Sequence, residues 1–174
     1  MWRSEIENSG GGIIVDHGSH LFYLASSILG EPKYITAQTE RLYHFEYTVE
    51  DTAWVNTKYE KGMAQFALTW AGRERETILK IFGTDGDISA TDSGLVLNTF
   101  GKKEKISLNE GLSSDSNHSD WYLGLFNKFY FRLKNKDFSK DGIDEAIMNT
   151  MCISAAYKSA EINKTVALKF SEID

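Results

Sequence analysis

The sequence predicts an α+β domain, with a mainly antiparallel open sheet and helices packed on one face. One segment near the N-terminus and two near the C-terminus repeat their apolar residues at intervals of three and four, as amphipathic helices do. Between them lie short segments rich in aromatic and β-branched residues, separated by turn residues. Because short connections join antiparallel neighbours, these segments are expected to form a meander.

The first helix is predicted over residues 16–29, and Gly30 and Pro32 follow it as helix-stop signals. The strand segments are, in order, residues 34–47, 52–59, 63–70, 75–82, 87–91, 95–100 and 103–108. Two further helices are predicted over residues 119–135 and 142–162. The last segment, residues 165–170, is too short to stand alone as a strand, so it is expected to join the sheet.

Composition and charge are those of an ordinary folded domain. The 174 residues are 41% hydrophobic and 25% charged, which predicts a single domain over residues 1–174. A net charge of -6 disfavours nucleic acid and anionic membranes as partners. Cys152 lies in an apolar run and is expected to be a buried, inert thiol. Without a signal peptide or an apolar run of ~18 residues, the expected location is cytoplasmic.

The most informative stretch is GGGIIVDHGSHLFYLASSILGEP, residues 10–32. At ~100° per helical residue, Asp16 and His20 share a polar stripe opposite the core face of the predicted helix. On this helical wheel His17 falls between Leu24 and Ile28 of the core face, so it is expected to pack against the core rather than to act in chemistry. The glycines at positions 10–12 are predicted to form a close-approach turn, because no GxGxxG or P-loop pattern accompanies them.

Asp16 and His20 leave three interpretations open. They can be a solvated helix edge, in which the acid offsets the helix macrodipole. They can be an acid/base pair, in which the carboxylate holds the tautomer of the imidazole so that the histidine acts as a base near neutral pH. A metal site is the least favoured, because the pair supplies only two ligands, and no metal is expected.

The second face of the sheet is a candidate contact surface. Neither alternating set of side chains in residues 63–70 is cleanly polar, and Trp54 stands among Asn56 and Lys58. Large exposed apolar patches are uncommon on monomers. A homo-oligomer formed through the open sheet face is therefore expected.

Four stretches together resemble the C-terminal domain of the Gfo/Idh/MocA oxidoreductases, the family of glucose-fructose oxidoreductase and inositol dehydrogenase. Residues 10–32 resemble the glycine run, Asp-x-Gly-x-His and Leu-Gly-x-Pro of the family. Residues 51–70 resemble its strand, glycine turn and strand ending in Ser/Thr-Trp. Residues 78–88 resemble its Ile-x-Gly-Thr-x-Gly hairpin, and residues 155–168 its closing helix and strand. The implied fold is that of the C-terminal domains of dihydrodipicolinate reductase and glyceraldehyde-3-phosphate dehydrogenase.

The resemblance implies an NAD(P)-dependent dehydrogenase that acts on a sugar, polyol or inositol hydroxyl. In that family an N-terminal Rossmann domain, absent from this chain, binds NAD or NADP and carries a catalytic lysine. This chain would then supply substrate contacts and the oligomer interface. No cofactor is expected on the chain itself, and the chain alone is expected to be inactive.

The resemblance also assigns individual residues. It makes His20 the base for the substrate hydroxyl and Asp16 its orienter or a hydroxyl ligand. Tyr23 stands where the family often has an acid, which leaves the substrate open. Four further residues lie in segments that line substrate pockets in the family: Trp2, Arg3, Trp70 and Arg73. The alternatives are a non-catalytic relative that keeps the fold for dimerisation and a free-standing binding module.

Overall fold

The structure is a computed structural model that describes residues 2–108, 112, 119–138 and 142–170. The chain divides into two compact units, one formed by Met1–Gly72 with Ser139–Asp174 and the other by Arg73–Phe138. Each unit has a four-stranded antiparallel sheet of its own. The fold class is therefore α+β with open antiparallel sheets, as predicted, although the strands are shared between two sheets rather than joined in one.

The first unit contains the sheet β3-β2-β1-β8. Its strands are β1 (Pro32–Glu40), β2 (Thr52–Tyr59), β3 (Met63–Thr69) and β8 (Val166–Ala167). All three pairings are antiparallel, and the C-terminal strand β8 pairs with β1, which confirms that the last segment joins the sheet. Alternation in β2 is regular: Val55, Thr57 and Tyr59 are buried, and the residues between them are exposed.

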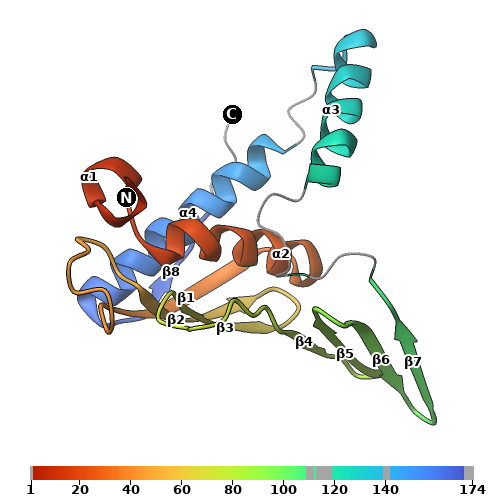
Figure 1. Cartoon of the computed structure of the whole chain (residues 1–174), viewed down its shortest axis with the longest axis horizontal. Helices are drawn as coiled ribbons and strands as arrows, with labels where there is room; N and C mark the ends of the chain where they lie inside the picture. The colour runs from red at the N-terminus through yellow and green to blue at the C-terminus, as the bar shows by residue number, and fades with distance from the viewer. Residues whose placement is uncertain (1, 109–111, 113–118, 139–141, 171–174) are drawn as a thin grey trace. The chain divides into compact units, whose positions relative to one another are not determined.

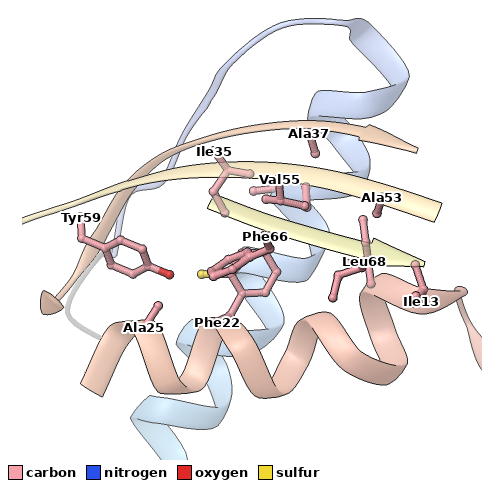
Figure 2. Packing of buried hydrophobic residues seen from close by; sticks show 14 residues of the cluster. Ile13, Phe22, Ala25, Ile35, Ala37, Ala53, Val55, Tyr59, Phe66 and Leu68 are labelled. Atoms are coloured by element: carbon pink, nitrogen blue, oxygen red, sulfur yellow. The ribbon is translucent and has the colours of Figure 1, made fainter. Parts of the chain in front are cut away.

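Helices α2 (Ser19–Leu29) and α4 (Ile143–Ile162) lie on one face of this sheet (Figure 1). Phe22 of α2 meets Phe66 of β3 edge to face, with ring centroids 5.3 Å apart. Figure 2 shows the core between this helix and the strands. Helix α4 buries only small residues there: Cys152, Ala155, Ala156 and Ser159. Their size lets the helix approach β1 closely, and the Ser159 hydroxyl accepts a hydrogen bond from the Ala37 amide at 2.9 Å.

The predicted first strand is longer than the observed one. Residues 41–47 are not a strand, because the buried carboxylate of Asp51 accepts hydrogen bonds from three consecutive amides of this segment. An amide that is bonded to a side chain cannot also take part in a strand ladder. The aromatic residues of this segment, which suggested a strand, instead form a cluster beside the sheet.

The second unit contains the sheet β4-β5-β6-β7. Its strands are β4 (Leu79–Phe82), β5 (Gly86–Thr91), β6 (Gly94–Thr99) and β7 (Lys102–Ile106). Gly86 and Gly94 begin their strands at φ of 159° and 127°, and a Cβ at Gly94 would lie 2.3 Å from the Ile106 carbonyl oxygen. This unit also contains α3 (Ser119–Lys134), whose aromatic side chains Tyr122, Phe126, Phe129 and Tyr130 are exposed.

Two short helical segments precede the glycine run. They are η1 (Trp2–Ser4) and α1 (Ile6–Ser9), and Gly10 ends the second with a left-handed φ of 74°. The chain then enters a π-helical turn, η2 (Ile14–Gly18), which continues directly into α2. The predicted first helix is thus confirmed over residues 19–29, while its first three residues belong to the π-helical turn.

Candidate functional site

The glycine run is a close-approach turn, as predicted. A Cβ added to Gly11 would lie 2.1 Å from the Tyr157 hydroxyl, and one added to Gly12 would lie 2.0 Å from the Glu50 carbonyl oxygen. Both distances are far below van der Waals contact. Only glycine allows these two chain segments to approach the run this closely.

Glu50 anchors the start of the helical segment. Its carboxylate accepts hydrogen bonds from the amides of Gly12 and Ile14, both at 3.1 Å. Its backbone carbonyl accepts a third from the Ile13 amide at 3.2 Å. The first amides of a helix lack partners within the helix. Here Glu50 alone accepts hydrogen bonds from three such amides.

Tyr157 of α4 completes this anchor. Its hydroxyl donates to Glu50 Oε1 at 2.7 Å and accepts from the Gly12 amide at 3.1 Å. Burial, together with the negative charge of Glu50, raises the pKa of Tyr157 well above its usual value. The phenol therefore stays protonated and acts as a donor. Neither Glu50 nor Tyr157 was a predicted site residue: Glu50 lies outside the four stretches that resemble the family, and no site was assigned to the closing helix that contains Tyr157.

The π-helical turn changes the expected faces of the helix. The prediction that His17 packs against the core is wrong: its side chain is 46% exposed and its Nε2 lies 3.5 Å from Asp16 Oδ2. The wheel assumed ~100° per residue, but residues 14–18 follow the wider π pattern, so positions before Ser19 are rotated. Leu24 and Ile28, which the same wheel placed on the core face, are also exposed.

Asp16 lies beside the N-terminal segment. Its Oδ1 is 3.9 Å from Arg3 Nη1, and its side chain is 26% exposed. The Arg3 guanidinium in turn lies 5.4 Å from the centre of the Trp2 ring, a cation-π distance. The structure thus brings together three residues that were predicted separately, with His17 as an unexpected fourth.

His20 lies one turn further, on the first turn of α2, and its side chain is exposed. Among the described residues, no hydrogen bond or ion pair joins His20 to Asp16. The direct contact implied by a local acid/base pair is therefore not formed in this chain. Both side chains remain open to a ligand or to another protein segment.

Asp51 builds the aromatic segment beside this site. Its fully buried carboxylate accepts hydrogen bonds from the amides of Leu42, Tyr43 and His44 at 2.7 to 3.0 Å and from the Thr52 hydroxyl at 2.8 Å. Burial alone acts to raise the pKa of Asp51, but these four donors outweigh it and lower the pKa to about 2. The carboxylate is therefore charged across the physiological range.

The aromatic segment reaches Trp70, another predicted site residue. The rings of His44 and Tyr47 stack with centroids 4.4 Å apart, and Tyr47 meets Trp70 edge to face at 6.2 Å. The Thr48 amide donates to the Ser4 carbonyl at 2.9 Å, which ties this segment to the one that carries Trp2 and Arg3. Arg73 belongs to the second compact unit, where it is exposed.

The open face of the first sheet presents mainly uncharged side chains. Tyr34, Trp54 and Met63 are each more than half exposed. Trp54 is the middle member of a row across the sheet, paired with Gln38 of β1 and Ala67 of β3. Lys58 is the charged residue on this face of β2. A tryptophan surrounded by small and uncharged neighbours is suited to contact another protein surface.

Three further expectations from the sequence concern Cys152, metal binding and membrane-spanning helices. Cys152 is fully buried, and burial raises the pKa of its thiol to about 12, as expected for an inert side chain. Over residues 2–108, 112, 119–138 and 142–170, no cluster of three or more potential metal ligands is found. Within the same residues, no helix combines the length and apolar character needed to cross a membrane.

Comparison with protein families assigns this α+β fold to a class of C-terminal domains. The family profile of the GFO/IDH/MocA C-terminal domain matches residues 1–89, which is just over half of the chain. The chain belongs to this family. Among curated proteins, no sequence matches the chain significantly.

Solved structures share the fold over nearly the whole chain. An oxidoreductase from Agrobacterium radiobacter, in complex with NAD+, L-tartaric acid and magnesium, superposes with a TM-score of 0.81 at 22% identity over 95% of this chain and 51% of its own. GenD2 from gentamicin A biosynthesis, in complex with NAD, gives 0.75 at 22% identity over 97% and 51%. Levoglucosan dehydrogenase gives 0.80 at 12% identity over 97% and 54%. The chain therefore spans about half the length of these proteins.

Proposed function

We propose that this chain is the substrate-binding and oligomerisation half of an NAD(P)-dependent oxidoreductase that acts on a hydroxyl group of a sugar, polyol or inositol. The observation that carries the proposal is the arrangement at the helix start. Asp16 and His20 are accessible, Arg3 and Trp2 lie beside Asp16, and Glu50 holds the turn. The family of the chain and the names of its structural neighbours support an oxidoreductase of this type.

The cofactor would be held by another part of the enzyme. A glycine run at a helix start can bind the phosphates of a dinucleotide through its free amides. Here the amides of Gly12, Ile13 and Ile14 already donate to Glu50, so this run does not fit a dinucleotide phosphate. Neighbouring structures bind NAD or NADH, and they are about twice as long as this chain.

The chain's own residues would handle the proton and the substrate. Oxidation of a hydroxyl group to a carbonyl removes a hydride, which NAD(P) would accept, and a proton, for which the exposed imidazole of His20 is a suitable acceptor. Asp16 and Arg3 offer an acceptor and a donor side by side, which suits adjacent hydroxyl groups of a polyol. Because Asp16 contacts Arg3 and His17 rather than His20, we assign it to binding a substrate hydroxyl, the second role that the resemblance offered.

A kinetic comparison in the full enzyme tests this assignment. His20→Ala is expected to lower kcat by roughly 10² to 10⁴, the usual range for a positioned acid or base. Asp16→Asn is expected to act mainly on KM, since the amide keeps the size but loses the charge. Ser27→Ala, on the exposed side of the same helix, is the control and should leave both constants unchanged. Full turnover in the His20→Ala enzyme would contradict the role of His20 as a base and favour the solvated helix edge.

The open face of the first sheet would form the oligomer interface. Its uncharged surface around Trp54 supports this role. Trp54→Lys is expected to shift the molecule toward monomers, as measured by light scattering over a range of concentrations, while Lys80→Glu in the second sheet should not. A wild-type protein that stays monomeric at high concentration would contradict the interface.

A further inference from the structure

We propose that Glu50 and Tyr157 are positioning residues that hold Asp16 in its place at the site. This inference rests on the proposed function of Asp16 and extends it to two residues far from Asp16 in the sequence. Each step of the connection is a contact between described residues.

The first step is the backbone of Gly12 and Ile13. The carbonyl oxygen of Gly12 accepts a hydrogen bond from the Asp16 amide at 3.1 Å, and the Ile13 amide of the same peptide unit donates to the Glu50 carbonyl oxygen at 3.2 Å. Because a peptide unit is planar and stiff, a displacement of the Ile13 amide also displaces the carbonyl that holds Asp16. The Gly12 amide, which belongs to the preceding peptide unit, is held by Glu50 Oε2 and by the Tyr157 hydroxyl, both at 3.1 Å. Glu50 and Tyr157 thus hold Gly12 itself, on which the position of this carbonyl depends.

The second step concerns where in the chain the two anchoring residues lie. Glu50 lies two residues before the start of β2, and Tyr157 lies in the second half of α4. The Gly12 contacts therefore span 38 residues to one partner and 145 to the other. A helix start is commonly satisfied by a Ser, Thr, Asp or Asn cap within the same turn. No such side chain bonds the start of this helical segment, and the turn is fixed to the sheet and to the last helix instead.

The third step is steric, because the turn has no free space around it. Gly11 and Gly12 leave no space for a Cβ against Tyr157 and Glu50. The hydroxyl of Tyr157 adds a second connection between Glu50 and Gly12, beside their direct hydrogen bond, and removing it leaves the ring in place. Tyr157→Phe thus loosens the turn without a change in volume or charge, which makes it a selective probe.

The test combines kinetics and hydrogen exchange. In the full enzyme, Tyr157→Phe is expected to reduce kcat/KM between roughly 10-fold and 100-fold, the range for a small misplacement of a substrate-binding group. In an Asp16→Asn background the same change should cost less than about 2-fold, because residues that act through one group are not additive. Tyr59→Phe is the matched control: it removes a hydroxyl at the other end of α2, far from Ile13 and the turn (Figure 2).

A second measurement is independent of activity. In the 174-residue chain, Glu50→Gln and Tyr157→Phe should each speed amide exchange at Gly12, Ile14 and Asp16 by about 10-fold or more, while amides of β2 stay protected. If Glu50→Gln does not fold, Tyr157→Phe alone carries the test, since it keeps the carboxylate. Unchanged exchange at these amides would overturn the positioning role.

The kinetic outcomes separate the two proposals. An equal loss from Tyr157→Phe with and without Asp16 would overturn positioning through Asp16 while leaving the proposed function intact. An Asp16→Asn enzyme with full activity would overturn the binding role of Asp16 in the proposed function. In that case faster exchange in the Glu50→Gln and Tyr157→Phe variants would still show that Glu50 and Tyr157 hold the turn. Their effect on the reaction through Asp16 would be rejected.

Discussion

Asp51 and Asp16 carry the same functional group in opposite surroundings. Asp51 is fully buried, and four donors lie within 3.0 Å of its carboxylate. Asp16 is about a quarter exposed, and its basic neighbours His17 and Arg3 lie at 3.5 and 3.9 Å. A buried carboxylate with every lone pair in use fixes the backbone around it. A carboxylate at the surface with longer contacts can still exchange them for a ligand.

The same contrast holds between Glu50 and His20. The Glu50 carboxylate accepts hydrogen bonds from two amides and a phenol, so few of its lone pairs remain for a substrate. His20 is exposed, and no described residue forms a hydrogen bond or ion pair with it. We infer that Asp51 and Glu50 hold the backbone of the site and that Asp16 and His20 contact its ligand. Four predictions test this distinction between the two groups of residues.

The largest expected effect is on the anchor of the turn. Gly12→Ala should destabilise the chain by about 3 kcal/mol or more, because its Cβ would meet the Glu50 carbonyl at 2.0 Å and neither backbone can move freely. Chemical denaturation measures the loss. Gly18→Ala is the control: its Cβ would make ordinary contacts at 3.5 Å, so its effect should be small. Similar losses in both variants would contradict the close approach.

Asp51→Asn comes next, with an expected loss of about 2 to 3 kcal/mol in the free energy of unfolding. The amide group of asparagine cannot accept from all four donors, so at least one buried amide loses its partner. Faster amide exchange at Leu42, Tyr43 and His44 should accompany the loss. If the three amides remain protected, the segment is held by something other than this carboxylate.

The pH dependence of stability follows from the same residue. The pKa of Asp51 is about 2 in the folded chain and 3.8 in its ordinary state. The stabilisation is therefore fully present above about pH 4 and is lost as the pH falls toward 2. The contribution is roughly 2 kcal/mol. Denaturation between pH 5 and 2 should show this loss in the wild type and a smaller one in Asp51→Asn.

The smallest expected effect is that of His17→Ala. Because the side chain of His17 is nearly half exposed, its loss should change the free energy of unfolding by less than about 0.5 kcal/mol. Thermal unfolding near neutral pH measures it. A loss of 2 kcal/mol or more would restore the core position that the helical wheel indicated.

Local patterns predicted much of the molecule. The residues 52–59 were predicted as a strand, and β2 has the same bounds, because alternation and flanking turn residues are local signals. Helix α4 was predicted within one residue for the same reason. The motif around Asp16 and His20 also pointed to the family, which the profile match over residues 1–89 confirms. The roles of these two residues stay predictions.

The sequence alone predicts the set of elements, the glycine turn and the family, since these depend on neighbours within a few residues. Which side chains and backbone groups contact one another is seen only in the tertiary structure. Glu50 and Tyr157 lie 107 residues apart and come together at Gly12, and no periodicity predicts that contact. The π-helical turn and the early end of β1 likewise arise because side chains from elsewhere bond these backbone amides. A distant carboxylate competes with the local hydrogen-bonding pattern, and its position is known only once the chain has folded.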